Sequence, residues 1–118
     1  NRIMELSECI MDEDSTEWRK FINDNSQLIR KNPEQFQFNI YLLQIWFSSI
    51  YRLKMGTADT LHNSKLKAKM ESFLNEYPNA NLQKINILLE ETLEAVGRNL
   101  YMSLTLTNLL INIHKNLK

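Results

Sequence analysis

The sequence predicts an all-α protein, a compact bundle of five to six helices with one long, buried central helix. Only 2 glycines and 2 prolines occur among the 118 residues, so few positions interrupt a helix. Hydrophobic residues make up 43% of the chain, which is enough to build a core. They recur three and four residues apart along most of its length, a spacing typical of amphipathic helices. The length suits a single domain that covers residues 1–118.

The longest expected helix begins at Asn32-Pro33, because asparagine caps helices and proline fits the first helical position. It runs to about Met55, and Gly56 is a natural stop. Residues 40–47 hold a single polar side chain, a composition typical of a buried helix. We therefore expect the aromatic residues of this helix to lie mainly in the core. The alternative is that part of this aromatic belt, or of the final helix, packs on another subunit.

Polar capping residues delimit the other expected helices. Asp14 with Glu17 resembles a capping box, Asn63 or Ser64 can cap a fourth helix, and Asn79 can cap a fifth. The six expected helices cover roughly 1–11, 15–31, 33–55, 64–77, 80–100 and 103–117.

Two segments leave an alternative open. Leu104-Thr105-Leu106-Thr107 alternates apolar and polar residues, a pattern that also fits a strand. Gly97 lies inside the fifth expected helix and marks either its end or a bend.

Residues that could carry chemistry are scattered along the chain. Cys9, His62 and His114 form neither a helical ligand pair nor a Cys-x-x-Cys motif, and Cys9 fits a small core residue. Gly56 and Gly97 make no glycine loop that could hold a phosphate. We therefore predict no enzyme activity, no metal, no cofactor and no small-molecule ligand in this segment.

Charge and cysteine content narrow the possible partners further. The 14 basic and 14 acidic residues give a formal net charge of zero, so we expect no direct binding to nucleic acid. A single cysteine is consistent with a cytoplasmic protein, and no apolar run is long enough to cross a membrane. Because the chain opens at Asn1 rather than at a methionine, we interpret it as part of a longer protein.

Two stretches carry a resemblance to a known family. Residues 46–56, WFSSIYRLKMG, followed by Leu61-His62-Asn63, resemble a Trp-bearing helix that runs into a lysine and a small residue and then a loop with hydrophobic-x-Asn. Arg98-Asn99 and Leu104-x-Leu106-x-x-Leu109-Leu110 resemble the family's closing signature. Together they resemble the collar domain of bacterial DNA polymerase III clamp-loader subunits, and the delta-prime pattern fits best.

The chain departs from that family pattern at two places. Ser48-Ser49 stands where the family commonly has Arg-Asp, and Tyr101-Met102-Ser103 stands where it tends to have Asn-Pro-Arg. The gamma/tau subunit, or a divergent relative, therefore stays open as the family member that the chain resembles.

The resemblance implies a role in assembly. Clamp-loader subunits have two N-terminal AAA+ regions and a helical C-terminal domain, and five such domains form a closed collar that holds the ATPase modules for loading the sliding clamp. The partners would be the other subunits of the ring, through contacts that differ on the two sides. We predict that the subunit interface includes Arg98, Asn99, Asn108 and Asn112, polar residues beside the closing leucine pattern.

Two other functions fit the same sequence. The first is a stand-alone helical adaptor or regulator, which the same amphipathic helices would serve. The second is a small helical enzyme, which would need His62 and His114 to lie together in a buried polar pocket.

Overall fold

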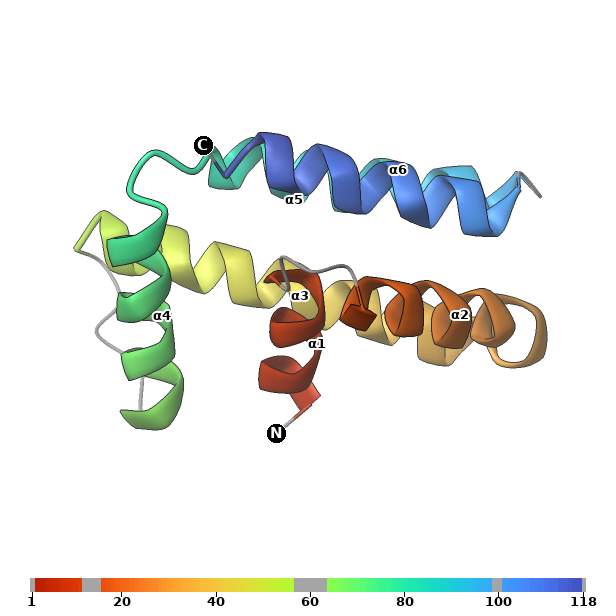
Figure 1. Cartoon of the computed structure of the whole chain (residues 1–118), viewed down its shortest axis with the longest axis horizontal. Helices are drawn as coiled ribbons and strands as arrows, with labels where there is room; N and C mark the ends of the chain where they lie inside the picture. The colour runs from red at the N-terminus through yellow and green to blue at the C-terminus, as the bar shows by residue number, and fades with distance from the viewer. Residues whose placement is uncertain (1, 12–15, 57–63, 99–100, 118) are drawn as a thin grey trace.

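The computed structural model describes residues 2–11, 16–56, 64–98 and 101–117, and within them every regular element is an α-helix. The all-α prediction is confirmed for these residues. Figure 1 shows the six helices in chain order. They are α1 (Arg2–Met11), α2 (Thr16–Lys31), α3 (Pro33–Lys54), α4 (Ser64–Glu76), α5 (Leu82–Gly97) and α6 (Met102–Lys115).

The boundaries of α3 follow the local chemistry that the sequence indicated. The Asn32 side chain accepts a hydrogen bond from the Gln35 backbone N–H over 3.2 Å, and Pro33 takes the first helical position. After the helix, Gly56 adopts a φ of 76°, a conformation that side chains with a Cβ rarely take. Both expected boundaries of the longest helix are therefore confirmed.

The two boundaries of α5 differ from the expected ones or needed the structure to be decided. The N-cap of α5 is Asn81, whose side chain accepts from the Lys84 N–H over 3.0 Å, so the expected cap at Asn79 is wrong. Residues 78–80 form a turn that places the cap two residues later. Gly97 is the last residue of α5, so this helix ends before Leu100. The capping box at Asp14 and the cap at Asn63 lie outside the described residues.

The alternating Leu-Thr segment is helical. Thr105 donates its backbone N–H to the Tyr101 carbonyl over 2.9 Å, and its hydroxyl donates to the same oxygen over 2.8 Å. The Thr107 hydroxyl likewise donates to the Ser103 carbonyl. Threonine hydroxyls that bond four residues back are compatible with a helix, and the strand alternative is excluded here.

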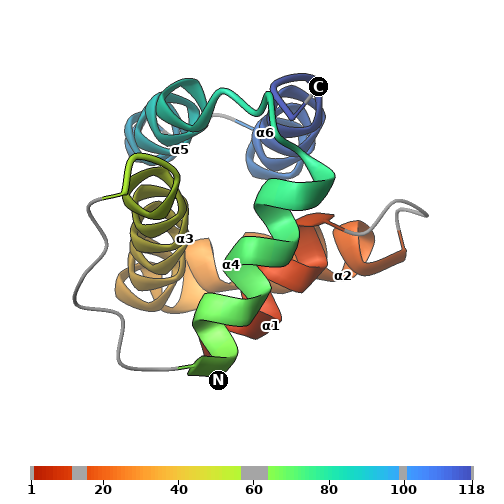
Figure 2. The same cartoon turned by 90° about the vertical axis from the view of Figure 1, so that its left-hand side faces the viewer.

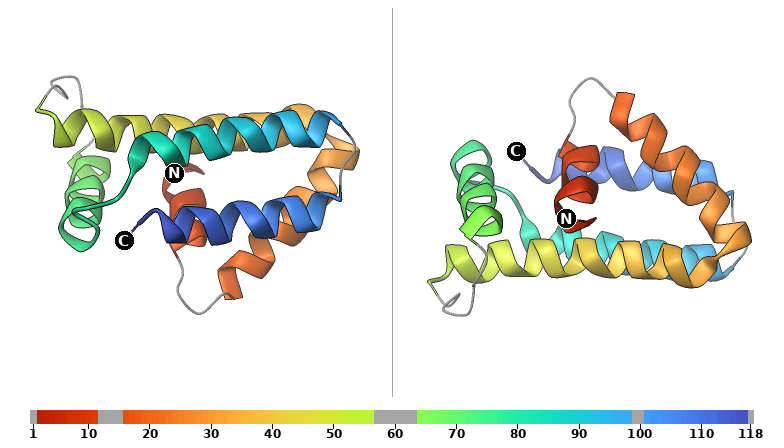
Figure 3. Two further views of the ribbon diagram at one scale, coloured as in Figure 1. Left: turned by 90° about the horizontal axis from the view of Figure 1, so that it is seen from above. Right: turned by 90° about the horizontal axis from the view of Figure 1, so that it is seen from below.

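Helices α2, α3, α5 and α6 form the main body. Helix α3 packs on α5 and α2, and α6 packs on the same two helices, so α3 and α6 occupy opposite corners (Figure 2). Seen from above and below, α5 lies beside α3, whereas α6 lies on the opposite side of the main body, where it contacts α2 (Figure 3). Helix α1 packs against α2 and α3, and α4 packs against the C-terminal half of α3.

Apolar side chains from every helix meet in one core. Helix α3 contributes most of the large side chains, and Trp46 is only 2% exposed. The face of α3 that points away from this core leaves Phe38, Tyr41 and Ile45 exposed. The fully buried large side chains are Trp46, Phe36, Phe47, Ile10, Ile40, Leu43, Ile50, Ile85, Leu89, Leu106, Leu110 and Ile113.

Polar contacts join the ends of α1, α2 and α6. The Trp18 indole N–H donates to the Ile10 carbonyl over 3.0 Å, and a His114 ring nitrogen lies within hydrogen-bonding distance of the same oxygen. The Trp18 and His114 rings meet edge to face, with centroids 4.3 Å apart. No described helix has the length and apolar character needed to cross a bilayer.

Candidate protein-interaction surfaces

A stripe of side chains runs along the outer face of α6. Tyr101, Leu104, Asn108 and Ile111 follow one another at intervals of three and four residues, so they share one side of the helix. All four are exposed, and Tyr101 is exposed to 85%. The buried leucines of α6 point in the opposite direction. We call Tyr101, Leu104, Asn108 and Ile111 the α6 stripe.

The residues predicted for an interface lie on or near this stripe, as far as the structure describes them. Asn108 is part of the α6 stripe, and Asn112 lies beside it and is partly buried. Arg98 is exposed at the C-terminal cap of α5, close in sequence to the start of α6. Asn99 lies outside the described residues. Three of the four predicted residues are therefore described: Arg98 lies at the end of α5, and Asn108 and Asn112 lie on α6.

A second exposed apolar stripe lies on α3, the helix whose aromatic residues were expected mainly in the core. Phe38, Tyr41 and Ile45 are spaced three and four residues apart on the face opposite the core, and each is exposed. We call these three residues the α3 stripe. Ile87 of α5 is also exposed, and it lines a groove together with Ser48 and Arg52 of α3. The helical spacing of these residues is visible in the sequence. The core-facing side of the same helix is equally apolar, however, so the spacing does not show which side is exposed.

Side-chain hydrogen bonds hold α3 and α5 together beside the α3 stripe. Three bonds with lengths of 2.9 to 3.3 Å connect the antiparallel helices, and all three fit one pairing register between α3 and α5. They join Gln44 with Glu90, Ser48 with Asn86, and Tyr51 with Gln83. The bonds fix the register of the two helices, so that the stripe is presented on a defined two-helix surface.

A groove of about 490 Å³ lies between α3 and α5 next to Ser48, Arg52, Asn86 and Ile87. The Asn86 side chain donates to the Ser48 hydroxyl, but its own buried carbonyl oxygen has no partner in the structure. A buried acceptor without a donor is uncommon in folded proteins. This unpaired oxygen is buried within a residue that lines the groove.

The two stripes face different directions because α3 and α6 lie at opposite corners of the four-helix body (Figure 2). Large side chains such as tyrosine, phenylalanine and isoleucine are costly to leave exposed, and aromatic residues are enriched at interface centres. The chain therefore presents two separate exposed stripes, one on α3 and one on α6.

Chemistry-bearing residues do not converge among the described residues. No group of three or more histidine, cysteine, aspartate or glutamate side chains within the described ranges could hold a metal ion. Partial burial, followed by a hydrogen bond to Glu17, raises the pKa of Cys9 to about 11, so its thiol is protonated at neutral pH. His62 lies outside the described residues, so its position relative to His114 is not defined.

Three acidic residues in the C-terminal half of α5 lie on its surface. Glu90, Glu91 and Glu94 are exposed, and Glu90 accepts a hydrogen bond from Gln44. Such positions resemble a solvated helix face rather than a desolvated acid–base pair.

Comparison of the chain with protein-family models, with curated protein sequences and with solved structures finds no match.

Proposed function

We propose that this chain is the oligomerisation module of a bacterial DNA polymerase III clamp-loader subunit, in which it holds AAA+ subunits together while the sliding clamp is loaded. The observation that carries the proposal is the pair of exposed apolar stripes on opposite corners of the bundle. A subunit inside a ring needs two different contact faces, one for each neighbour. A stripe on α3 and another on α6 meet that need.

The residues behind the family resemblance support the proposal in two ways. Trp46, Leu106 and Leu110 lie in the core, so these parts of the pattern have a packing role. Leu104 belongs to the same pattern but is 58% exposed, in the α6 stripe. One leucine of the closing signature is thus placed where a neighbouring subunit could bury it, and packing within this chain does not account for it.

The expected energetics of such a contact follow from the exposed side chains. Tyr41, Phe38 and Tyr101 would act as anchors, because buried aromatic residues carry much of the binding energy in protein interfaces. Exposed charges at the C-terminal end of α5, such as Glu94 and Arg98, would belong to the rim and help to select the partner. The ATPase, clamp and DNA contacts would belong to other parts of the subunit, and the complex would act in the cytoplasm.

An alternative function is a stand-alone helical adaptor. The same two stripes would serve it, since an adaptor also joins two partners. The choice between the two depends on which proteins bind the stripes.

The test is a pull-down of the full-length protein with purified clamp-loader subunits of the same organism, with and without residues 1–118. Tyr41→Glu and Leu104→Glu place a charge in the centre of each stripe, and each should abolish binding of one neighbour while the other is retained. Gln27→Glu adds the same charge at an exposed position on α2 and should leave assembly intact.

Three results would decide against the clamp-loader assignment. They are assembly without residues 1–118, assembly unaffected by both stripe variants, and the absence of binding to any clamp-loader subunit. Binding of unrelated proteins through the same stripes would favour the adaptor.

A further inference from the structure

A cavity of about 350 Å³ lies between α1 and α4, away from both stripes, with walls that also include residues of α2 and α3. Its aromatic wall consists of Trp46, Phe73 and Tyr77. The Phe73 and Tyr77 rings are tilted with centroids 5.2 Å apart. The volume lies in the lower part of the range of small-molecule sites, large enough for a group of the size of an amino acid.

The indole N–H of Trp46 has no hydrogen-bond partner in the structure, although Trp46 lines this cavity and is only 2% exposed. The chain's other tryptophan differs, since the Trp18 indole N–H donates to the Ile10 carbonyl. Buried tryptophan N–H groups normally find an acceptor. A ligand that enters the cavity with a carbonyl oxygen would supply the acceptor that the fold lacks.

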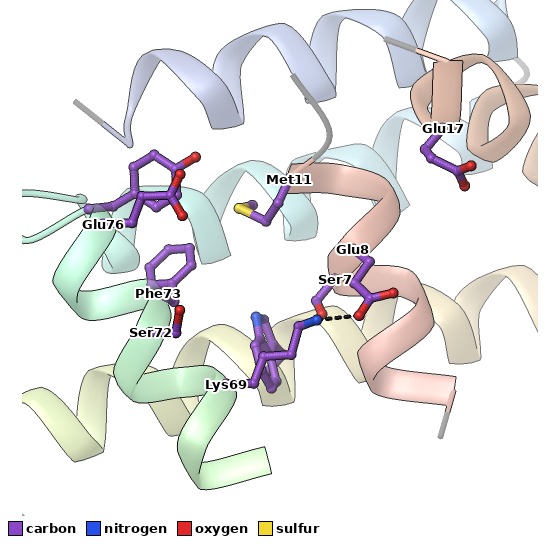
Figure 4. Close-up of a pocket in the computed structure, with 10 residues that line it drawn as sticks. Ser7, Glu8, Met11, Glu17, Lys69, Ser72, Phe73 and Glu76 are labelled. Atoms are coloured by element: carbon purple, nitrogen blue, oxygen red, sulfur yellow. Dashed lines mark hydrogen bonds and ion pairs between the residues drawn. The ribbon is translucent and has the colours of Figure 1, made fainter. Parts of the chain in front are cut away.

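The charged residues around the cavity favour a cation. Three glutamates and one lysine line it, and the lysine, Lys69, forms an ion pair with Glu8. Figure 4 shows this ion pair bridging α4 and α1, with Phe73 and Glu76 farther along α4. Glu76 has no ion-pair partner among the described residues. Carboxylates and aromatic faces together attract an ammonium group, and Lys69 shows that the cavity already accommodates one.

We propose that this cavity binds an organic ammonium group whose carrier also presents a carbonyl oxygen, as in a lysine residue. The ammonium group pairs with Glu76 beside the aromatic wall, and the carbonyl accepts the Trp46 indole N–H. The carrier is either a lysine on a polypeptide segment or a free small amine. The proposal does not depend on the clamp-loader assignment, because the cavity shares no residue with either stripe.

The probe that tests the proposal is Nα-acetyl-lysine amide, titrated into the full chain. The two indole N–H resonances are followed by NMR, and the Trp18→Phe variant assigns them. We expect a saturable downfield shift of the Trp46 resonance, with little change at Trp18. Nα-acetyl-norleucine amide lacks the ammonium group and should produce no such shift.

Matched variants separate the contributions of the two groups. Glu76→Gln should weaken binding by roughly tenfold, the size of a lost charge-assisted contact. Glu91→Gln removes the same charge from an exposed site on α5 and should have no effect. 1,5-Diaminopentane has the ammonium group without the carbonyl and should bind more weakly, without the Trp46 shift. Tighter binding of acetyl-Ala-Lys-Ala amide than of the lysine amide would assign the carrier to a polypeptide, whereas equal binding would assign it to a free amine.

The proposal is overturned by a Trp46 resonance that does not move with the lysine amide, or by an equal shift with the norleucine amide. Unchanged affinity in Glu76→Gln would also overturn it. None of these results would change the outcome of the assembly test, because that test changes residues of the stripes and measures binding to other subunits.

Discussion

The Asn39 side-chain amide donates to the Asn25 side-chain oxygen over 3.0 Å inside the core and thereby joins α2 to α3. Both residues are buried, and the Asn25 amide in turn donates to the Phe21 carbonyl over 2.9 Å. Gln35 donates to the Asn39 oxygen from the same helix. This chain of bonds satisfies polar atoms that would otherwise be buried without partners.

Replacing one member of this pair should destabilise the fold. Asn39→Ala leaves the Asn25 oxygen without its donor, and we expect a loss of roughly 1–3 kcal/mol in the free energy of unfolding. Chemical denaturation followed by circular dichroism measures it. The double variant Asn25→Ala/Asn39→Ala should cost less than the sum of the two single changes, because the bond can be lost only once. Strict additivity would show that the two side chains are not coupled.

Trp46 should contribute to stability mainly through packing. Trp46→Ala removes a large buried side chain and should cost about 3–5 kcal/mol, seen as a lower melting temperature. Trp46→Phe keeps an aromatic ring and removes an N–H that has no partner, so its cost should be clearly smaller. An unchanged melting temperature in Trp46→Ala would contradict the packing role.

Leu104 and Leu106 provide a matched pair two residues apart in one helix. Leu106 is fully buried, so Leu106→Ala should cost about 2–5 kcal/mol. Leu104 is 58% exposed, and Leu104→Ala should change stability by about 0.5 kcal/mol or less. In a strand the two side chains would share a face, so similar losses in thermal denaturation of the two variants would contradict the helical register.

Local signals in the sequence were sufficient for much of the fold. The start of α3 depends on contacts between Asn32 and residues three or four positions away, and its end depends on the backbone freedom of Gly56, so both could be predicted. The cap of α5 could not, because Asn79 and Asn81 are equally good caps until the turn geometry is known. The sequence pattern identifies both asparagines as candidate caps, and the geometry of the turn determines that Asn81 caps the helix.

The exposed stripes on α3 and α6 were harder to predict for a different reason. On α6 the polar residue Asn108, chosen for its place beside the leucines, lies on the exposed side of the helix within the α6 stripe. On α3 both faces are apolar, so Phe38 could not be distinguished from the buried Phe36 by residue type. The separation depends on which neighbouring helices cover α3, and that is set by tertiary packing rather than by local sequence.

Cys9 should react slowly with thiol reagents at neutral pH. Burial raises the pKa of its thiol to about 11, and the hydrogen bond that the thiol donates to Glu17 adds to the effect. An unperturbed cysteine has a pKa of about 8.5, so the thiolate fraction of Cys9 at pH 7 should be lower by more than roughly a hundredfold. Stopped-flow reaction with a disulfide reagent, in the folded chain and in denaturant, measures this difference.

The same pKa shift sets the direction of a stability change at high pH. The folded state holds the Cys9 proton more tightly than the unfolded state, so this contribution to stability is complete below the unfolded pKa and is lost as the pH rises toward 11. Glu17→Gln removes the neighbouring charge and should lower the Cys9 pKa and speed the reaction. Glu8→Gln, which removes the weakest of the contributing charges, should have a smaller effect. A reaction as fast as that of free cysteine, or an equal response to both variants, would contradict this assignment of causes.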